Sequence, residues 1–230
     1  MRTDGIIVAI DGPAGAGKST TAKAVATALG YLYLDTGAMY RAVALAAQDA
    51  GVDPNDEGAM AALCEGLAIT QASRADGTRT FIDGQDVSEA IRTPEISDLA
   101  SRVAVHPPVR EVLVRTQKAI GAGGGIVLEG RDTTTAVFPD AELKVFLEAS
   151  VDARAERRRR QLSESGTTVD VDTIRADIEA RDDRDRATQA RHGAWPPPDA
   201  IRVDTTGLTI DQQVKRIVSL AHTQGARAIT

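Results

Sequence analysis

Short apolar runs alternate with stretches of helical spacing along most of this chain. The first run, Ile6–Ile10, predicts a buried strand, because five consecutive apolar residues leave no polar face. Apolar residues at 22, 25, 26 and 29 follow at helical spacing and predict a helix over 18–29 that ends at Gly30. The same rhythm predicts strands over 32–34, 126–128, 143–147 and 200–203, and helices over 38–50, 108–120, 151–162, 171–186 and 209–222. Five strands that alternate with helices predict an α/β fold, with a parallel sheet between two layers of helices and a ligand at the strands' carboxyl ends.

The stretch from about 52 to 107 interrupts this rhythm. Residues 67–70 and 79–82 are typical of two strands around a polar turn, and 88–105 has helical spacing with Pro94 at a boundary. We expect an inserted lobe that contains a small antiparallel sheet.

A phosphate-binding loop follows the first strand. It has the pattern Gly-x-x-x-x-Gly-Lys-Ser and reads Gly12, Pro13, Ala14, Gly15, Ala16, Gly17, Lys18, Ser19, with Thr20 next. Glycines let backbone N–H groups point into one concavity, and the N-terminus of the following helix adds a positive dipole end. Lys18 would reach the β- and γ-phosphates, and the Ser19 hydroxyl would bind Mg²⁺. The chain is therefore expected to bind MgATP, with Mg²⁺ as its cofactor.

The charge balance limits the class of partner. The chain carries 27 Lys and Arg against 33 Asp and Glu, a net charge of −6, which argues against a nucleic-acid polymer. A lone Cys64 indicates a reducing compartment, and neither a signal peptide nor a membrane-spanning run is seen. We expect a cytoplasmic monomer whose partners are small molecules, with no membrane association.

Arginine-bearing loops after two strands indicate a second anionic substrate. One holds Arg41 and the other Arg131 with Asp132, and strand ends in a parallel sheet meet at one edge. Arg154, Arg157 and Arg158 share one face of a helix, as do Arg181 and Asp185. The alternative for these residues is an exposed, salt-bridged surface or a simple turn. An Asn-Lys-x-Asp motif for guanine is absent.

Longer motifs extend these signals. They are D-T-G-A-M-Y-R at 35–41, D-V-S-E-A-I-R-T at 86–93, E-G-R-D at 129–132, V-F-P-D-A at 137–141, K-V-F-L-E-A-S at 144–150 and R-D-D-R-D at 181–185. With them the chain resembles the bacterial cytidylate kinase family nearly end to end. The resemblance implies a P-loop kinase core with strand order 2-3-1-4-5, formed by 1–51, 108–153 and 187–230. It also implies that 52–107 is a monophosphate-binding insertion and that 154–186 holds a short lid with Arg-rich helices.

The same resemblance assigns roles residue by residue. Ser101, Arg110 and Asp132 would recognise the cytosine edge, Thr36, Arg181 and Asp185 the ribose, and Arg41 and Arg131 the monophosphate, with Gly37 and Tyr40 in the same CMP site. Lys18, Arg131, Arg154, Arg158 and Arg181 would surround the transferring phosphoryl group. Asp35 or Asp132 would contact Mg²⁺ through water.

Two segments depart from the family pattern. Thr133-Thr134-Thr135 stands where Ile or Met, Gly and Thr are usual, so a β-branched residue replaces a glycine. Thr188 stands where many members have an arginine, and Arg186 or Arg191 would have to supply its phosphate contact.

The expected reaction is ATP + CMP, with dCMP as a further acceptor, giving ADP + CDP. A phosphate monoester is largely dianionic at neutral pH, so the attacking oxygen needs no general base. We therefore assign His106, His192 and His222 no catalytic role. The alternatives are a P-loop kinase for UMP, dephospho-coenzyme A or shikimate, and a nucleotide-dependent switch that hydrolyses slowly.

Overall fold

The structure is a computed structural model that describes residues 2–74, 77–164, 166–167, 169–190 and 194–227. The chain forms two compact units, one comprising Met1–Tyr31 and Gly123–Thr230 and the other Leu32–Ala122. The narrower boundaries expected for an insertion at 52–107 and a lid at 154–186 stay predictions. Within the described part of the chain, no helix combines the length and apolar character needed to cross a membrane.

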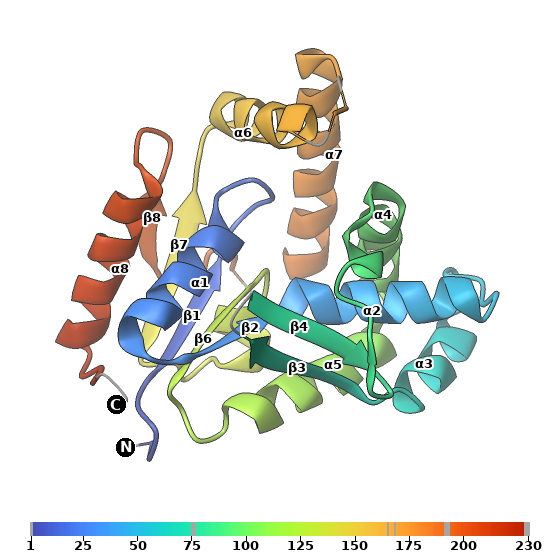
Figure 1. Cartoon of the computed structure of the whole chain (residues 1–230), viewed down its shortest axis with the longest axis horizontal. Helices are drawn as coiled ribbons and strands as arrows, with labels where there is room; N and C mark the ends of the chain where they lie inside the picture. Colours follow the sequence, from blue (N-terminus) through green and yellow to red (C-terminus); the bar gives the residue numbers. More distant parts are fainter. Residues whose placement is uncertain (1, 75–76, 165, 168, 191–193, 228–230) are drawn as a thin grey trace. The chain divides into compact units, whose positions relative to one another are not determined.

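The expected parallel sheet is present among the described residues. Its five strands run in the order β2-β6-β1-β7-β8 (Figure 1), which are Leu32–Asp35, Ile126–Gly130, Ile7–Asp11, Leu143–Glu148 and Ile201–Asp204. Every residue of β1 and β6 is buried, including the apolar runs 7–10 and 126–128 that predicted these interior strands. At the carboxyl end, Asp11 of β1 is in register with Gly130 of β6 and Phe146 of β7. The α/β fold class and the strand order 2-3-1-4-5 are confirmed.

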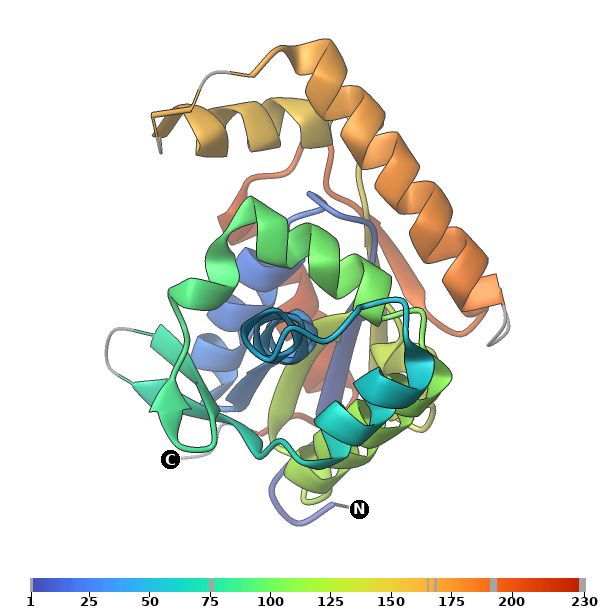
Figure 2. The ribbon, with the colours of Figure 1, turned by 90° about the vertical axis from the view of Figure 1, so that its right-hand side faces the viewer.

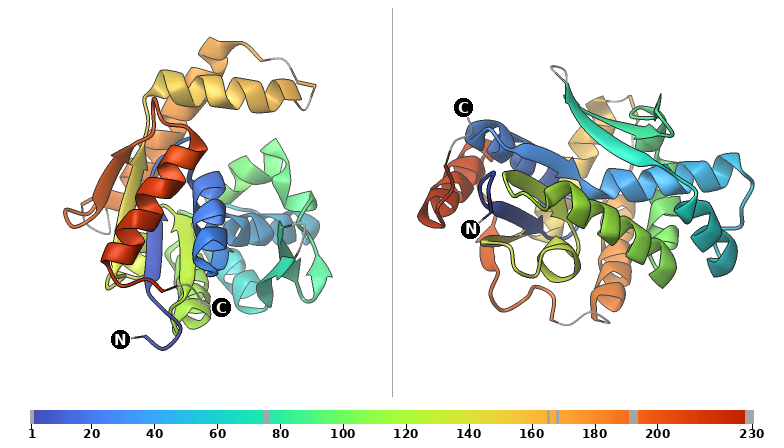
Figure 3. Two further views of the ribbon diagram at one scale, coloured as in Figure 1. Left: turned by 60° about the vertical axis from the view of Figure 1, so that its left-hand side comes forward. Right: turned by 90° about the horizontal axis from the view of Figure 1, so that it is seen from below.

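Four helices of the first unit follow the predicted pattern closely. They are α1 (Lys18–Leu29), α6 (Val151–Glu164), α7 (Val171–Gln189) and α8 (Ile210–Thr223). α8 packs beside α1 (Figure 3) and begins with a capping box, in which Thr209 and Gln212 each bond the other's backbone N–H. α6 and α7 pack on each other (Figure 2) around a small core of Ala155, Ile174 and Ile178.

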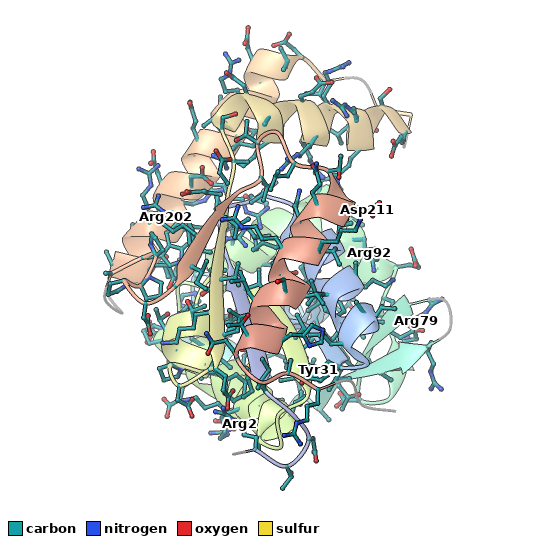
Figure 4. The ribbon with its side chains drawn as sticks, turned by 90° about the vertical axis from the view of Figure 1, so that its left-hand side faces the viewer. Arg2, Tyr31, Arg79, Arg92, Arg202 and Asp211 are labelled. Carbon is teal, nitrogen blue, oxygen red and sulfur yellow. The ribbon has the colours of Figure 1, made fainter. Side chains whose placement is uncertain are left out.

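Two ion pairs link β7 to β8, an edge strand of the parallel sheet, and to the loop that precedes it. Arg202 of β8, labelled in Figure 4, donates to Glu148 of β7 (2.6 Å), and Lys144 donates to Asp199 (2.5 Å). Charged side chains on an edge strand discourage further strand pairing.

The second unit combines helices with a three-stranded antiparallel sheet of β3 (Ile69–Arg74), β4 (Gly77–Ile82) and β5 (Gln85–Asp86). Its helices are α2 (Thr36–Asp49), α3 (Glu57–Glu65), η1 (Ala90–Arg92), α4 (Pro94–Val103) and α5 (Pro107–Gly121). The helical spacing over 88–105 corresponds to η1 and α4, and the expected boundary at Pro94 is confirmed. Thr93 caps α4 and Pro94 occupies its first turn, where a missing N–H costs nothing. The nine-residue α3 was missed.

Candidate active site

The P-loop lies between the end of β1 and the start of α1. Gly12 has φ 151°, and a Cβ there would lie 2.1 Å from the Leu147 carbonyl oxygen, so a side chain would collide with β7. A Cβ at Gly15 would lie 3.1 Å from the Cβ of Arg154. The motif glycine Gly12, and Gly15 within the loop, thus lie where neighbouring chain segments approach closely.

Three carbonyl groups of the loop are held from outside. The Ala14 oxygen accepts from Arg154 Nη1 (3.1 Å), the Gly15 oxygen from Arg157 Nη1 (3.3 Å) and the Ala16 oxygen from Thr205 Oγ1 (3.1 Å). In a planar trans peptide the N–H points opposite to the C=O. The amides of the next residues are therefore turned toward the inner side of the loop, as anion binding requires.

Lys18 lies at the centre of a cluster of charges. Its side chain is buried, and Nζ donates to the Pro13 carbonyl (2.9 Å). The pKa of Lys18 is lowered to about 7, mainly by burial and then by the nearby Arg131 and Arg181 guanidiniums, although Glu129 and Asp185 act to raise it. Burial and the neighbouring cations together disfavour the charged ammonium group. A bound phosphate would relieve both effects.

Ser19, in the first turn of α1, and Glu129, near the carboxyl end of β6, are joined by a hydrogen bond. Ser19 Oγ donates to Glu129 Oε1 at 2.7 Å, and Glu129 is buried. Sequence reasoning placed Ser19 at the metal but gave Glu129 no role. Its position one strand from the P-loop, at the end of an apolar run, is a signal that could have identified it.

Arg131 and Asp185 form an ion pair between the end of β6 and α7. Arg131 Nε donates to Asp185 Oδ2 at 2.6 Å, and both side chains are about one-fifth exposed. Burial acts against the charge on both groups, yet their attraction holds the pKa of Asp185 below and that of Arg131 above the ordinary value. Asp132, the next residue, is buried.

A buried carboxylate explains why threonines stand at 133 and 134, where the family pattern has other residues. Asp11 is fully buried and accepts from the backbone N–H of Thr133 (3.0 Å) and Thr134 (2.9 Å) and from both their hydroxyls. The two residues begin a π-helical turn, η2 (Thr133–Val137), that the sequence pattern did not predict. The hydroxyls of Thr133 and Thr134 donate to the Asp11 carboxylate at the end of β1. The β-branched side chain at 134 therefore has a defined position in the core.

Replacing Thr134 by valine should lower the free energy of unfolding by about 1–3 kcal/mol, because the buried Asp11 loses a charge-assisted donor with little change of shape. Urea unfolding measures the change. Thr135→Val is the matched control, since that hydroxyl makes only a long bond to the Asp132 carbonyl (3.4 Å). Equal losses at 134 and 135 would mean that the hydroxyl of Thr134 contributes nothing special.

The arginines of α6 have different surroundings. Arg154 is buried and donates to both carboxylate oxygens of Asp182 on α7, at 3.0 and 2.6 Å. Arg157 contacts Gly15 and Thr205 at the P-loop, whereas Arg158 is exposed. Their expected contacts with a transferring phosphoryl group stay predictions. The exposed, salt-bridged alternative fits Arg159 and Arg160, which both pair with Glu156.

The second unit carries the D-T-G-A-M-Y-R motif at the start of α2. Asp35 caps the helix by accepting from Ala38 N (2.8 Å) and also binds Arg41 Nη2 (3.1 Å). A Cβ at Gly37 would lie 3.2 Å from Arg41 Nη1 and 3.3 Å from Asp35 Oδ1, so glycine leaves room for this pair. Thr36 and Tyr40 are buried on the same turns.

Ser101 and Arg110 lie on the two helices that pack against α2 within this unit. Ser101 Oγ, on α4, donates to the Ser97 carbonyl (3.3 Å), and Arg110, on α5, is 8% exposed. The second unit therefore groups Thr36–Arg41, Ser101 and Arg110 on three packed helices.

The remaining residues named in the sequence analysis are Arg186, Arg191 and the three histidines. Arg186 is exposed and pairs with Asp183 (3.1 Å), so its contact with a phosphate stays a prediction. The other candidate, Arg191, and His192 lie outside the described residues. His106 and His222 contact the carbonyl groups of Pro54 and Ala226.

Comparisons with known proteins show the family to which the chain belongs. A cytidylate kinase family model matches residues 8–223. A cytidylate kinase of Enterococcus faecalis is 46% identical over 220 residues, covering 96% of this chain and 97% of that protein. One from a Geobacter species is 46% identical over 213 residues, covering 92% and 91%. An uncharacterized protein from Eubacterium ventriosum shares the fold alone, with a TM-score of 0.51 and 13% identity over 95% of this chain and 98% of that one. The chain belongs to the cytidylate kinase family.

Proposed function

We propose that this enzyme, a nucleoside monophosphate kinase, transfers the γ-phosphoryl group of ATP to CMP and dCMP, giving ADP and the nucleoside diphosphate. The observation that carries this proposal is the convergence of Lys18, Arg131 and Arg181 beside the P-loop, with Glu129 and Asp185 among them. The relatives named above carry the name of the same kinase. A cytoplasmic location and a monomeric state remain predictions.

The cationic cluster suits the electrostatics of phosphoryl transfer. Two polyanionic substrates repel each other, and charge spreads over the transferring group in the transition state. Lys18 and the loop amides would hold the donor, and Arg131 and Arg181 would stabilise the developing charge together with Arg154 and Arg158 of the lid. Catalysis then rests on in-line positioning and electrostatic stabilisation, because a dianionic acceptor needs no base.

The donor set near the P-loop fits Mg²⁺. Ser19 and Glu129 offer hard oxygen ligands at 2.7 Å from each other, and Mg²⁺ prefers a few carboxylates together with phosphates and water. Among the described side chains, no group of three or more His, Cys, Asp or Glu could hold a metal, so the remaining ligands would be phosphate oxygens and water. When bound with ATP, the ion would neutralise charge on the β- and γ-phosphates. Asp35 already caps α2, which favours Glu129 or Asp132 as the acidic partner.

Each unit carries residues proposed to bind the acceptor: Thr36–Arg41, Ser101 and Arg110 in the second unit, and Arg131, Asp132, Arg181 and Asp185 in the first. Arg110 can donate to cytosine O2 and N3, and Ser101 and Asp132 can bond the remaining polar atoms of the base edge. Thr36, Arg181 and Asp185 would hold the ribose, and Arg41 with Arg131 the monophosphate. Gly37 and Tyr40 complete the first turns of α2.

The decisive experiment is a coupled assay of ADP release with CMP, dCMP, UMP, AMP and GMP as acceptors. Release that depends on CMP and dCMP is the expected result. If ADP release depends on UMP, AMP or GMP instead, the acceptor would be that nucleotide and not CMP. ATP hydrolysis that no acceptor stimulates would favour the nucleotide-dependent switch.

Replacing Arg110 by methionine should raise the KM for CMP at least about tenfold, because a charge-assisted hydrogen bond to the base is lost. The KM for ATP should stay within about twofold, as ATP makes no contact with α5 in this proposal. Steady-state kinetics with each substrate varied in turn measures both. Arg115→Met on the same helix is the matched control, since Arg115 is 62% exposed and pairs with Glu65. Equal loss for both substrates would remove Arg110 from base recognition.

A further inference from the structure

We propose that Trp195 is a positioning residue for the acceptor phosphate, acting through the backbone of Arg131. Its indole Nε1–H donates to the Arg131 carbonyl oxygen at 2.7 Å. This inference rests on the proposed function, because it concerns how the chain holds the residues assigned there to CMP. The sequence pattern placed Trp195 in an irregular surface loop and gave it no function.

The bonded carbonyl belongs to the peptide that joins Arg131 to Asp132. Fixing a peptide plane fixes one dihedral angle on each side of it, so the indole orients both residues at once. Arg131 is proposed to bind the monophosphate and Asp132 the base. One hydrogen bond from outside the segment therefore acts on two contacts with the same substrate.

The indole is itself held against the sheet. Its ring meets the ring of Phe146 edge to face, with the centroids 5.0 Å apart and an interplanar angle of 87°. Phe146 is buried on β7, in register with Asp11 of β1. Aromatic pairs of this geometry contribute beyond their buried area. Trp195 is thus fixed to a rigid strand and not only to the loop that carries it.

The residues after Arg131 are held by Asp11, which lies in register with Phe146 in the sheet. Asp11 binds Thr133 and Thr134, and the Asp132 carbonyl accepts from the backbone N–H groups of Thr135, Ala136 and Val137 in η2. The Arg131 carbonyl is the point at which this segment leaves β6, and the hydrogen bond there comes from Trp195. Without it, the peptide between Arg131 and Asp132 could rotate while the rest of the segment stayed in place.

The test uses the full chain and removes only the donor. Trp195 is the single tryptophan of the sequence, so a tryptophan auxotroph can replace it by β-(3-benzothienyl)alanine, which has the indole shape but no N–H. The matched control is 7-azatryptophan, which keeps the N–H. W195F is the genetically encoded counterpart, and Arg131→Ala is measured in parallel.

Loss of the donor should raise the KM for CMP about 3- to 10-fold, the range of one hydrogen bond and its orienting effect, with the KM for ATP within about twofold. The 7-azatryptophan protein should match the unsubstituted one. An unchanged KM for CMP in the benzothienyl protein overturns the inference, as does a KM for ATP that rises equally. A purely structural role would lower the unfolding midpoint without this difference between substrates.

Failure of the proposed function has a different signature. If the unsubstituted enzyme does not use CMP, or if Arg131→Ala leaves the KM for CMP unchanged, the assignment of Arg131 fails whatever Trp195 does. If Arg131→Ala weakens CMP and the benzothienyl protein does not, only the inference about Trp195 fails.

Discussion

Replacing Arg131 by alanine should lower kcat at least about tenfold while the enzyme remains folded. Arg131 lies beside Lys18 in the charge cluster, and a preorganised cation at a transferring phosphoryl group stabilises the transition state more than the ground state. Steady-state kinetics with saturating ATP and CMP measures kcat, and circular dichroism confirms the fold. An unchanged kcat would remove Arg131 from the transition state.

The ion pair with Asp185 has to be separated from this effect. The Asp185 carboxylate, which is only 18% exposed, loses its partner in Arg131→Ala. The free energy of unfolding therefore falls as well. The double variant Arg131→Ala, Asp185→Ala removes that penalty, and its kcat should stay low if the cation itself assists transfer. Recovery of kcat in the double variant would mean that the single change acts by disturbing Asp185.

Replacing Asp182 by alanine should lower the free energy of unfolding by about 3–5 kcal/mol, because the Arg154 guanidinium then remains buried without its counter-ion. Arg154 would keep its bonds to the Ala14 and Ala149 carbonyls, which lack a full negative charge. Urea unfolding, with the slope checked for constancy, measures the difference.

The next residue along α7 provides the control. Asp183 is 74% exposed and pairs with the exposed Arg186, so Asp183→Ala should change stability by only about 0–1 kcal/mol. The double variant Arg154→Met, Asp182→Leu should lose less stability than Asp182→Ala, since no charge is left buried. Similar losses for Asp182→Ala and Asp183→Ala would show that burial of the pair has no energetic consequence.

The sequence predicted the parallel sheet and its helices well because each has a strong local period. β1 and β6 are buried at every position and begin with uninterrupted apolar runs, and α1 ends at Gly30 in the left-handed conformation, as the pattern indicated. The short α3 was missed because nine residues give few turns in which a period can be seen. The boundary at Pro94 was predicted, and the Thr93 cap shows that this proline begins a helix.

Side-chain partners were less accessible. Helical spacing grouped Arg154, Arg157 and Arg158, but Arg158 is exposed and Arg154 pairs with Asp182, on another helix. The pair depends on how α6 and α7 pack, which no period in either helix encodes. Trp195 contacts Arg131 from a loop with no periodic pattern at all. Residue type therefore predicted the chemistry of the site, while tertiary packing determined which groups meet.

The spacing of Asp182 and Asp185 on α7 has a mechanical consequence. Three residues rise about 4.5 Å along a helix, so the bonds to Arg154 and to Arg131 act at two nearby points of one rigid rod. A turn of α7 about its axis that releases one carboxylate also pulls on the other. The two arginines, one at the donor loop and one at the end of β6, are thereby coupled through a helix that can rotate only if both attachments give way together.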